Sequence, residues 1–521
     1  MNWLDYTIVV VYSVGFLLLG NYFKDQKSKS EYFLGGKSFG WLPLGLSVMA
    51  TQLSAISFVS APAFVGLREG GGLQWLSFEF AVPLAMLFLS FVLIPKLYRG
   101  GVVSIYEYLQ RRFGRSTRLL ISIVFQISRS FSTGVMIYAV ALILTGILSI
   151  PMWQTILVIG LVTIAYSYQG GMKAVVYGDM IQMIILLIGI VICGAVGLSL
   201  LGGWGELTVG VDRSRLEAVD FTTWGIGGDG DFGFFPMVIG GLFLYASYYG
   251  TDQSQVQRLL SAKDLKTAQK TLLFNGVIRF PITLMYCLMG LVIGTLALKT
   301  PEFIEQIPRD RVDLMMPIFI RDFLPHGLIG LLIVAILSAA MSSLSSAINS
   351  LSAVTTEDIL VGNREVDTDT YVKYSKWSSL FWGGVCVVLA FFSGNIADTV
   401  IEAINKVGSV FYGPILATFV AALRFPRIGG RAMNLGLVLG VGTNVFLWLV
   451  VGDQLFWFWW NFVGAAIAFG IAYAVSFSSK KEAEPAAENL REEVRRSDVI
   501  ILLVSFVAMV LISISIKYLF V

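Results

Sequence analysis

The sequence predicts an all-α integral membrane protein, and its composition alone indicates a membrane protein. Hydrophobic residues make up 56% of the 521 residues, charged residues only 14%, and the mean hydropathy is +0.77. Soluble domains carry about 25% charged residues, so this chain lies well outside their range. The lipid bilayer is therefore a predicted partner, and the net charge of +3 gives no indication of nucleic-acid binding.

Apolar runs of about 18 residues or more are long enough to cross a bilayer as helices. The sequence predicts about 14 such spans, at residues 5–23, 40–66, 74–96, 116–148, 152–169, 177–201, 233–252, 270–299, 325–352, 376–394, 397–422, 432–452, 455–476 and 498–519. The first run has no basic residue before Lys24, so we expect a retained helix and not a cleaved signal peptide.

The distribution of Lys and Arg predicts how these spans are oriented. The loops that alternate from 24–39 onward hold 26 basic residues, whereas the opposite loops hold seven. Basic residues concentrate in cytoplasmic loops, so both termini are predicted to be extracellular. The stretch 479–496 is rich in both charges and is predicted to be a cytoplasmic linker.

A row of small polar side chains lies in the ninth predicted span, within SAAMSSLSSAINS (338–350). A helix would place the following members on one face: Ser338, Ser342, Ser345, Ser346 and Asn349. Uncharged oxygens suit a cation that must be held weakly and released, as a transported sodium ion is. The alternative is that these small residues form a helix-packing face, which is common in membrane bundles.

Two predicted spans are interrupted by glycine, proline or polar residues, and they lie five helices apart. The second contains Gly45, Pro62 and a polar run made of Thr51, Gln52, Ser54, Ser57 and Ser60. The seventh contains Gly240, Gly241 and the patch 245–250. Interrupted helices at matching positions of two inverted repeats indicate a midplane binding site in secondary transporters. We therefore expect helices 2–6 and 7–11 to be such repeats.

Five segments, in order, resemble the sodium:solute symporter family: ATQLSAISF (50–58), SIYEYLQRRF (104–113), GGMKAVVYGDMIQ (170–182), TDQSQVQRLLSAK (251–263) and SAAMSSLSSAINS (338–350). The resemblance implies a LeuT-type core of two inverted five-helix repeats, with one extra helix before it and three after. The implied divisions are an N-terminal helix and loop (1–39), the first repeat (40–201), an extracellular loop (202–232), the second repeat (233–422) and the C-terminal helices (423–521).

The resemblance also implies sodium ligands. The family's main sodium site corresponds here to Ala50, Leu53, Ala339, Ser342 and Ser343. A second site, found in some members, would use Asp179 with Ser342, Ser345 and Ser346. Gly178 replaces the hydroxyl residue that usually precedes this aspartate, which would loosen the second site. The alternative for Asp179 is a carboxylate favoured by the dipole of a helix N-terminus.

Substrate contacts are implied for three charged residues. Glu79 and Arg279 match positions that bind sugar in the sugar symporters, and Arg129 matches the arginine that holds the carboxylate of sialic acid. A guanidinium forms two parallel hydrogen bonds to a carboxylate, so an anionic substrate is chemically reasonable. The alternatives are that Arg129 pairs with Glu79 or another internal carboxylate, and that Arg279 reaches the cytoplasmic interface.

The remaining candidate substrate residues are polar or aromatic, namely Thr51, Gln52, Ser54, Ser57, Tyr245 and Tyr248. The two tyrosines flank the predicted break in the seventh span, where Tyr248 is a candidate inner gate, although tyrosine is also frequent at membrane interfaces. Asp398, Glu402 and Lys406 recur every four residues in the eleventh span and are expected to form an internal salt-bridged ladder.

The predicted function is sodium-driven import of a small polar organic solute by alternating access, with one or two sodium ions per cycle. A sugar, a sialic acid or another sugar acid is the first expectation for the solute. A small monocarboxylate or vitamin-like anion is the alternative, and a channel or a sensor is a more distant one. An enzyme is not expected, because the single histidine, His326, rules out a catalytic triad or histidine metal site. We expect a monomer in the cell membrane.

Overall fold

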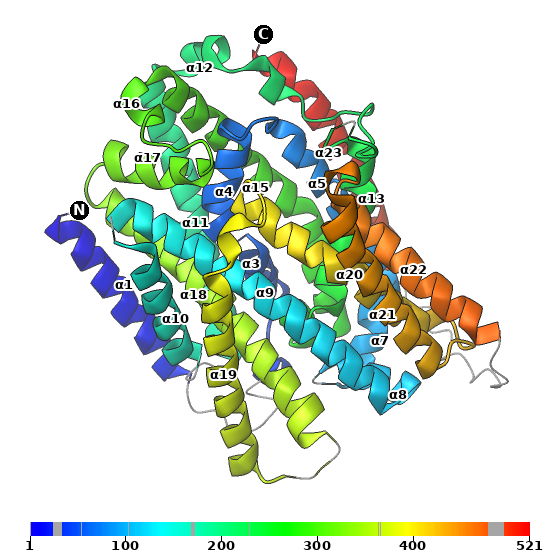
Figure 1. Cartoon of the computed structure of the whole chain (residues 1–521). Coiled ribbons are helices and arrows are strands. Elements are labelled where there is room, and N and C mark those ends of the chain that lie inside the picture. The colour runs from blue at the N-terminus through cyan, green and yellow to red at the C-terminus, as the bar shows by residue number, and fades with distance from the viewer. Residues whose placement is uncertain are drawn as a thin grey trace.

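The computed structural model describes residues 2–520 except for 24–33, 54, 103, 149, 168–171, 229, 363, 365 and 478–493. The described part of the chain is a bundle of helices (Figure 1). The all-α prediction is therefore confirmed. Most of the predicted linker at 479–496 lies outside the described residues.

The first half of the chain supplies helices that cross the bundle in both directions. Their bounds are α1 (Trp3–Tyr22), α3 (Trp41–Gln52), α4 (Ala55–Gly66), α5 (Leu76–Glu79), α6 (Ala81–Phe88), α7 (Ile94–Arg99), α8 (Ile105–Phe113), α9 (Arg115–Leu148), α10 (Met152–Ser167), α11 (Met172–Leu201) and α12 (Trp204–Gly210). A short π-helical segment, η3 (Leu89–Leu93), joins α6 to α7, so residues 73–99 form one long helical span.

The second half begins with a long helix and its short continuation. The bounds are α13 (Phe234–Thr251), α14 (Gln253–Leu260), α15 (Leu265–Lys299), α16 (Pro301–Ile304), η5 (Val312–Leu314), α17 (Met315–Phe323), α18 (Leu328–Val354), α19 (Thr368–Ala390), α20 (Val400–Arg424), α21 (Gly430–Phe446), α22 (Phe458–Phe477) and α23 (Arg496–Ser515). The short helices α12, α16 and α17 lie at one end of the bundle and α8 at the other (Figure 1). We call these the α12 end and the α8 end.

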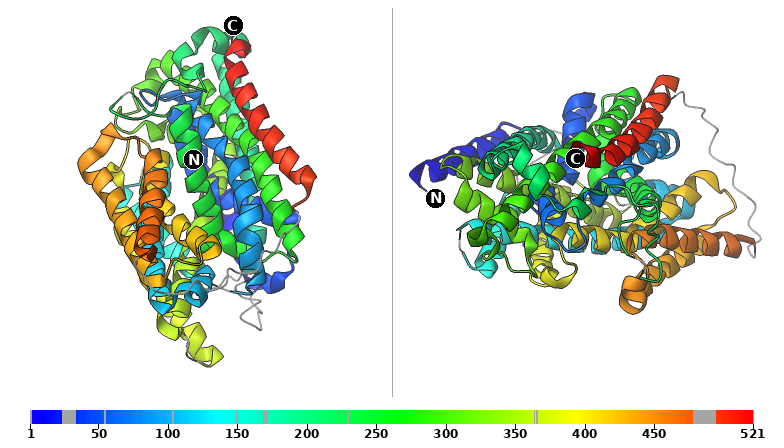
Figure 2. Two further views of the ribbon diagram at one scale, coloured as in Figure 1. Left: turned by 90° about the vertical axis from the view of Figure 1, so that its right-hand side faces the viewer. Right: turned by 90° about the horizontal axis from the view of Figure 1, so that it is seen from above.

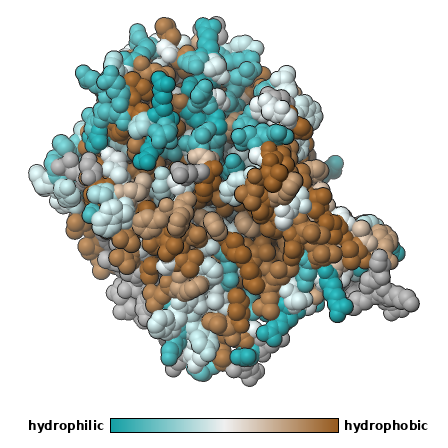
Figure 3. Space-filling view, in the orientation of Figure 1, coloured by the Kyte–Doolittle hydropathy of each residue, from teal (hydrophilic) through white to brown (hydrophobic). Residues whose placement is uncertain are grey.

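A hydrophobic belt lies between two more polar ends of the molecule. Figure 3 shows apolar residues across the middle of one face and hydrophilic residues concentrated at the α12 end. Eight described helices are long and apolar enough to cross a membrane, or nine if the bent pair of α3 and α4 is one span. Helices also occupy the other predicted spans, but the count of 14 and the inverted repeat stay predictions.

The predicted break in the second span is confirmed. Helix α3 ends at Gln52, α4 begins at Ala55, and the two helix axes differ by 55°. Gly66 in α4 lies so close to α15 that a Cβ atom there would be 2.5 Å from the Gly290 carbonyl oxygen. Close contact through small residues is a typical way to pack membrane helices. It holds α4 against a long, continuous neighbour.

The break predicted inside the seventh span is wrong in position. Helix α13 is continuous from Phe234 to Thr251, and the break falls at Asp252, before α14. Gly240 and Gly241 serve packing instead: a Cβ at Gly240 would lie 2.3 Å from the Phe458 carbonyl oxygen. Glycine allows close approach as well as bending, so the sequence pattern could not separate the two roles.

The C-terminus lies at the α12 end, whereas the N-terminus lies part of the way down the bundle from it (Figure 2). Trp204 in α12 packs against Phe520, with ring centroids 5.1 Å apart. Near the other terminus, the Asp5 carboxylate accepts hydrogen bonds from the backbone N–H groups of Gly327 and Gly330 at 2.7 and 3.0 Å. These contacts cap the start of α18 and fix α1 beside it. The extracellular position of this end stays a prediction.

Candidate substrate and sodium sites

A cavity opens beside the break between α3 and α4. Helices α5, α9, α13, α15 and α20 complete its wall, and aromatic rings cover much of it, including Trp75, Phe78, Tyr286 and Tyr412. Seven of the predicted substrate residues line it: Thr51, Gln52, Ser57, Glu79, Arg129, Tyr248 and Arg279. An apolar cavity with a few convergent polar groups is the usual form of a small-molecule site.

Glu79 and Arg279 form a buried ion pair in this cavity. The Arg279 Nε lies 2.5 Å from Glu79 Oε2, and Nη2 lies 3.1 Å from Oε1. Both side chains are almost fully buried, with exposed fractions of 1% and 4%. The alternative that Arg279 reaches the cytoplasmic interface is therefore wrong, and so is a pairing of Arg129 with Glu79.

Two tyrosines complete the Glu79–Arg279 pair. Tyr245 donates its hydroxyl to Glu79 Oε1 at 3.1 Å and accepts from Arg279 Nη2 at the same distance. Tyr249 accepts from Arg279 Nη1, also at 3.1 Å. Phe78 stacks on the Tyr245 ring, with centroids 4.3 Å apart. Every nitrogen of this guanidinium thus has an acceptor, and Tyr245 acts behind the cavity wall, not in it.

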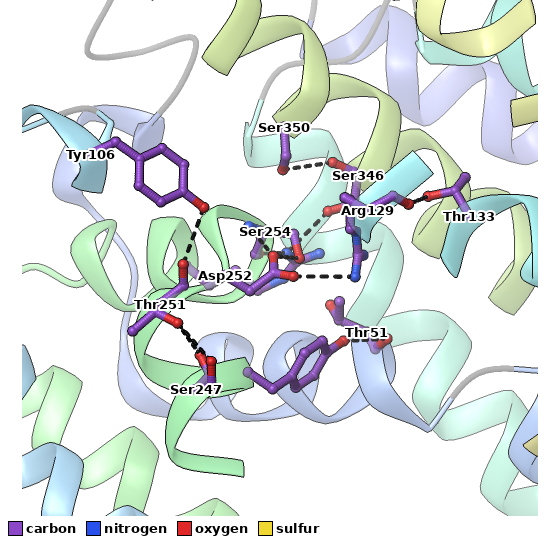
Figure 4. Close-up of polar contacts among 12 residues, drawn as sticks. Thr51, Tyr106, Arg129, Thr133, Ser247, Thr251, Asp252, Ser254, Ser346 and Ser350 are labelled. Atoms are coloured by element: carbon purple, nitrogen blue, oxygen red, sulfur yellow. Dashed lines mark hydrogen bonds and ion pairs between the residues drawn. The ribbon is translucent and has the colours of Figure 1, made fainter. Parts of the chain in front are cut away.

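Arg129 has a much weaker partner on the opposite side of the cavity. Its Nη1 lies 3.5 Å from Asp252 Oδ2, a long contact for a charged pair. Arg129 is only 4% exposed, yet its Nε and Nη2 have no hydrogen-bond partner within the described part of the structure. Figure 4 shows the guanidinium between Asp252 and Thr51. The alternative that Arg129 pairs with an internal carboxylate is therefore confirmed in part, with Asp252 as the carboxylate.

Asp252 is held in place by the chain break that it occupies. Its Oδ1 accepts from the backbone N–H and the hydroxyl of Ser254, at 2.8 and 2.6 Å, and so caps α14. Just before it, the Thr251 carbonyl oxygen accepts from the Tyr106 hydroxyl at 3.2 Å. Because one carboxylate oxygen is committed to the helix start, only the other faces Arg129 (Figure 4).

Further polar atoms in the cavity wall lack partners in the described chain. They are the side-chain oxygen of Gln52 and the hydroxyl of Ser132. Ser132 lies one turn after Arg129 on α9, so both side chains face the same space. Sequence reasoning missed Ser132, although its spacing from Arg129 in RSFS was a usable signal. Tyr248, the candidate gate, donates to the Thr51 carbonyl oxygen at 3.4 Å.

The structure describes some of the residues predicted for the main sodium site, and the site itself stays a prediction. Ala50 and Leu53 are buried where α3 ends, and carbonyl groups at a helix end lack partners in a next turn. Helix α18 packs against both α3 and α4. Its Ser343 hydroxyl is fully buried and has no hydrogen-bond partner among the described residues. Ser54 and the side chains of Ala339 and Ser342 lie outside the description.

The residues of the predicted second sodium site surround an arginine. Asp179 is fully buried, and its Oδ2 lies 2.8 Å from Nη2 of Arg258. Nη1 of the same guanidinium donates to the Ser346 hydroxyl at 3.1 Å. Ser345 is buried one residue away. Arg258 was missed because it lies between the predicted spans 233–252 and 270–299, in what was expected to be a cytoplasmic loop, whereas α14 carries it into the bundle.

A wide polar vestibule lies next to the cavity, towards the α12 end. Neighbouring residues of α20 line the two spaces: Glu402 and Lys406 face the vestibule, and Asn405 faces the cavity. Arg68 binds Glu402 at 2.9 Å and Asp398 at 3.2 Å. The expected ladder of Asp398, Glu402 and Lys406 is therefore wrong, because Arg68 from another segment is the cation and the described structure shows no ion pair for Lys406.

Comparison with known proteins shows which transporters this chain resembles. The human sodium/iodide cotransporter is 31% identical over 436 residues, which cover 83% of this chain but only 66% of that protein. The sodium-coupled monocarboxylate transporter 1 of Xenopus laevis is 30% identical, over 87% of this chain and 72% of its own length. The solved structure of a Na+-coupled sialic acid symporter has the same fold, with a TM-score of 0.81 at 23% identity over 92% of this chain and 98% of that one.

The sequence relationship extends over the core helices and both predicted site regions. Residues 32–440, which run from just before α3 to within α21, match the sodium:solute symporter family. The relatives are transporters and not enzymes, in line with the prediction. This chain belongs to the sodium:solute symporter family.

Proposed function

We propose that this protein uses a sodium gradient to import a small organic monoanion, with a carboxylate bound by Arg129. The observation that carries the proposal is the pair of buried Arg129 nitrogens, Nε and Nη2, that have no partner in the described structure. An unpaired buried donor on a charged group is costly, so such a site is stabilised when an anion enters. The Ser132 hydroxyl beside it supplies a further donor.

The opposite wall favours a compact carboxylate over a neutral sugar. Sugar hydroxyls would need free acceptors and donors there, but Glu79 and Arg279 already bind each other and two tyrosine hydroxyls. The aromatic rings of Trp75 and Phe78 suit an apolar body attached to the carboxylate. The names of the human and frog relatives, an iodide and a monocarboxylate transporter, also describe monoanions. A sugar acid is the second candidate, because it shares the carboxylate.

Coupling follows from the break after α3, where sodium and substrate would share one short segment. Ala50 and Leu53 are the proposed sodium ligands on that segment, while Thr51 and Gln52 line the substrate cavity. Sodium bound by those carbonyls and by Ser343 would fix the segment in the shape that the substrate needs. One sodium ion and one monoanion carry no net charge together, so the sodium concentration gradient drives their import, and only a sodium ion beyond the first adds about 2.3 kcal/mol per 100 mV of membrane potential. The α12 end, with its vestibule, would face outward.

The proposal is tested with purified protein in thermal-shift assays and in proteoliposome uptake. Propionate, lactate and sialic acid are compared with galactose and with lactamide, the uncharged match of lactate. We expect stabilisation and uptake by the carboxylates only, in sodium and not in potassium or choline. Equal responses to lactate and lactamide would overturn the carboxylate site, and uptake that persists without sodium would overturn the coupling.

A further inference from the structure

We propose that Arg258 acts as a built-in cation for Asp179, so that the protein couples substrate to one sodium ion, at the main site, and not to two. The inference rests on the proposed sodium symport and determines its coupling ratio. The same guanidinium closes the α8 end of the substrate pathway. Arg258 is thus a positioning residue for coupling, since it acts through the helices that carry the site.

Arg258 is bound on all sides by groups from four separate helices. Its Nε donates to the Ser47 hydroxyl of α3 at 2.8 Å, and its Nη2 donates to Asp179 of α11 at 2.8 Å. Its Nη1 donates to Ser346 of α18 at 3.1 Å and to the Ser254 carbonyl oxygen of its own helix, α14. Only 1% of Arg258 is exposed.

Ser47 forms a hydrogen-bonded bridge between Asp179 and Arg258, in addition to their direct contact. Its hydroxyl donates to Asp179 Oδ2 at 2.5 Å while it accepts from Arg258 Nε. Asp179 and Ser47 are both fully buried. Buried charges persist when they are paired and hydrogen-bonded, and here Asp179 Oδ2 accepts hydrogen bonds from both Ser47 and Arg258.

The charge of the cluster argues against an added sodium ion. Asp179 contributes one negative charge and Arg258 one positive charge, so the buried pair is neutral as it stands. A sodium ion at Asp179 would leave one positive charge uncompensated in a medium of low dielectric constant. It would also be repelled by the ion at the main site, since Ser343 and Ser346 lie one turn apart on α18. One oxygen of the carboxylate that the second site needs, Asp179 Oδ2, is therefore already bound to Arg258 and Ser47.

The position of the cluster gives it a role in gating. Helices α3 and α14 are the halves of the broken spans that point to the α8 end, whereas α11 and α18 are continuous. A movement of α3 and α14 relative to α11 and α18 that opened this end would break the contacts of Arg258 with Asp179 and Ser346. The guanidinium therefore holds the pathway closed at the α8 end while the vestibule is accessible.

The coupling ratio is measured on the unmodified protein in proteoliposomes. It is the amount of radioactive sodium taken up divided by the amount of labelled substrate taken up at the same time. We expect one sodium ion per substrate and a sodium Hill coefficient near one. A ratio of two, with a Hill coefficient that falls towards one in Asp179→Asn, would overturn the inference. An absence of any sodium-coupled uptake would instead contradict the proposed function.

Variants separate charge compensation from a merely structural role. In Arg258→Gln, Asp179 loses its cation, so we expect the Hill coefficient of substrate binding to rise towards two. Arg258→Lys keeps the charge and should stay near one. If Arg258→Gln fails to fold, the neutral pair Asp179→Asn with Arg258→Gln should recover folding with a coefficient of one. A coefficient that is the same in wild type, Arg258→Gln and Arg258→Lys would refute charge compensation.

Gate closure has an independent readout. Ser350, one turn after Ser346 on α18, is buried and can be replaced by cysteine after the three native cysteines are changed to alanine. We expect a membrane-impermeant thiol reagent, applied from the α8 end in sodium, to label Ser350→Cys at least about tenfold faster when Arg258 is also changed to Gln. An unchanged rate would show that Arg258 does not hold this end closed.

Discussion

Two buried arginines face the same cavity from opposite sides, and their surroundings differ in one decisive respect. Arg279 has an acceptor for each nitrogen, supplied by Glu79, Tyr245 and Tyr249. Arg129 has one long ion-pair contact, to Asp252, a second contact to the Tyr248 hydroxyl, and two nitrogens without a partner in the described chain. Burial and charge are alike, so neither distinguishes a structural arginine from a binding one. The number of guanidinium nitrogens without a hydrogen-bond partner distinguishes them.

The largest expected effect is a loss of stability when the fully hydrogen-bonded ion pair of Glu79 and Arg279 is broken. Glu79→Gln or Arg279→Gln leaves a buried charge uncompensated, which typically costs about 3–5 kcal/mol of stability. We expect either single variant to melt well below the wild type in detergent. The double variant Glu79→Gln with Arg279→Gln should recover most of that loss, because no net charge remains buried. Single variants that melt like the wild type would show that the pair is not structural.

Arg129 should respond in the opposite way. Arg129→Gln removes a guanidinium whose charge is compensated only in part, so the fold should be kept. The affinity for a carboxylate should fall by about 2–5 kcal/mol, or roughly 30-fold to several thousandfold. Arg129→Lys should also bind weakly, since an ammonium lacks the planar fork. Calorimetric titration with substrate in sodium measures the affinity. Normal binding by Arg129→Gln would contradict its role as the carboxylate site.

Ser132 should make a smaller contribution to carboxylate binding than Arg129 does. Its unpartnered hydroxyl lies one turn from Arg129, and a hydrogen bond to a charged group contributes about 1.5–3 kcal/mol. Ser132→Ala should therefore weaken carboxylate binding about 10-fold to 150-fold without affecting stability. Thr133→Ala is the matched control, because that hydroxyl already donates to the Arg129 carbonyl oxygen. Equal losses in the two variants would exclude a direct contact.

Asp313 lines the vestibule and provides a third comparison. There we ask whether a buried carboxylate oxygen without a hydrogen-bond partner binds a proton. Its Oδ2 accepts from the Val400 N–H at 2.9 Å, while Oδ1 is buried without a partner in the described structure. Burial raises the pKa of Asp313 to about 6, from the ordinary value of 3.8, and nearby Glu402 adds to the shift. The folded state therefore binds this proton more tightly than the unfolded state does.

The sign of the pH effect follows from that raised pKa. The stabilisation is complete below about pH 4 and is lost as the pH rises through about 6. We expect the wild type to lose about 1–2 °C in melting temperature between pH 5 and pH 7 relative to Asp313→Asn, a small shift because the chain is long. Identical pH profiles for the two proteins would show that Asp313 is ionised throughout this range.

Local features of the candidate site were predictable, and long-range pairings were not. The polar run in ATQLSAISF predicted the break after α3, because an unwound turn needs polar surroundings in a membrane. The pairing of Glu79 with Arg279 joins residues 200 positions apart, and no local pattern specifies it. The same holds for Asp179 and Arg258, since the sequence placed Arg258 in a loop.

The sequence by itself determined the membrane class, the helical spans and the family, because lipid demands long apolar helices and family motifs are short and continuous. The tertiary structure decided which buried charges are already neutralised and which are open to a ligand. That distinction depends on distances of a few ångströms between helices that are remote in sequence. A buried guanidinium with full hydrogen bonding stabilises the fold, while the same group with unmet bonds forms a binding site.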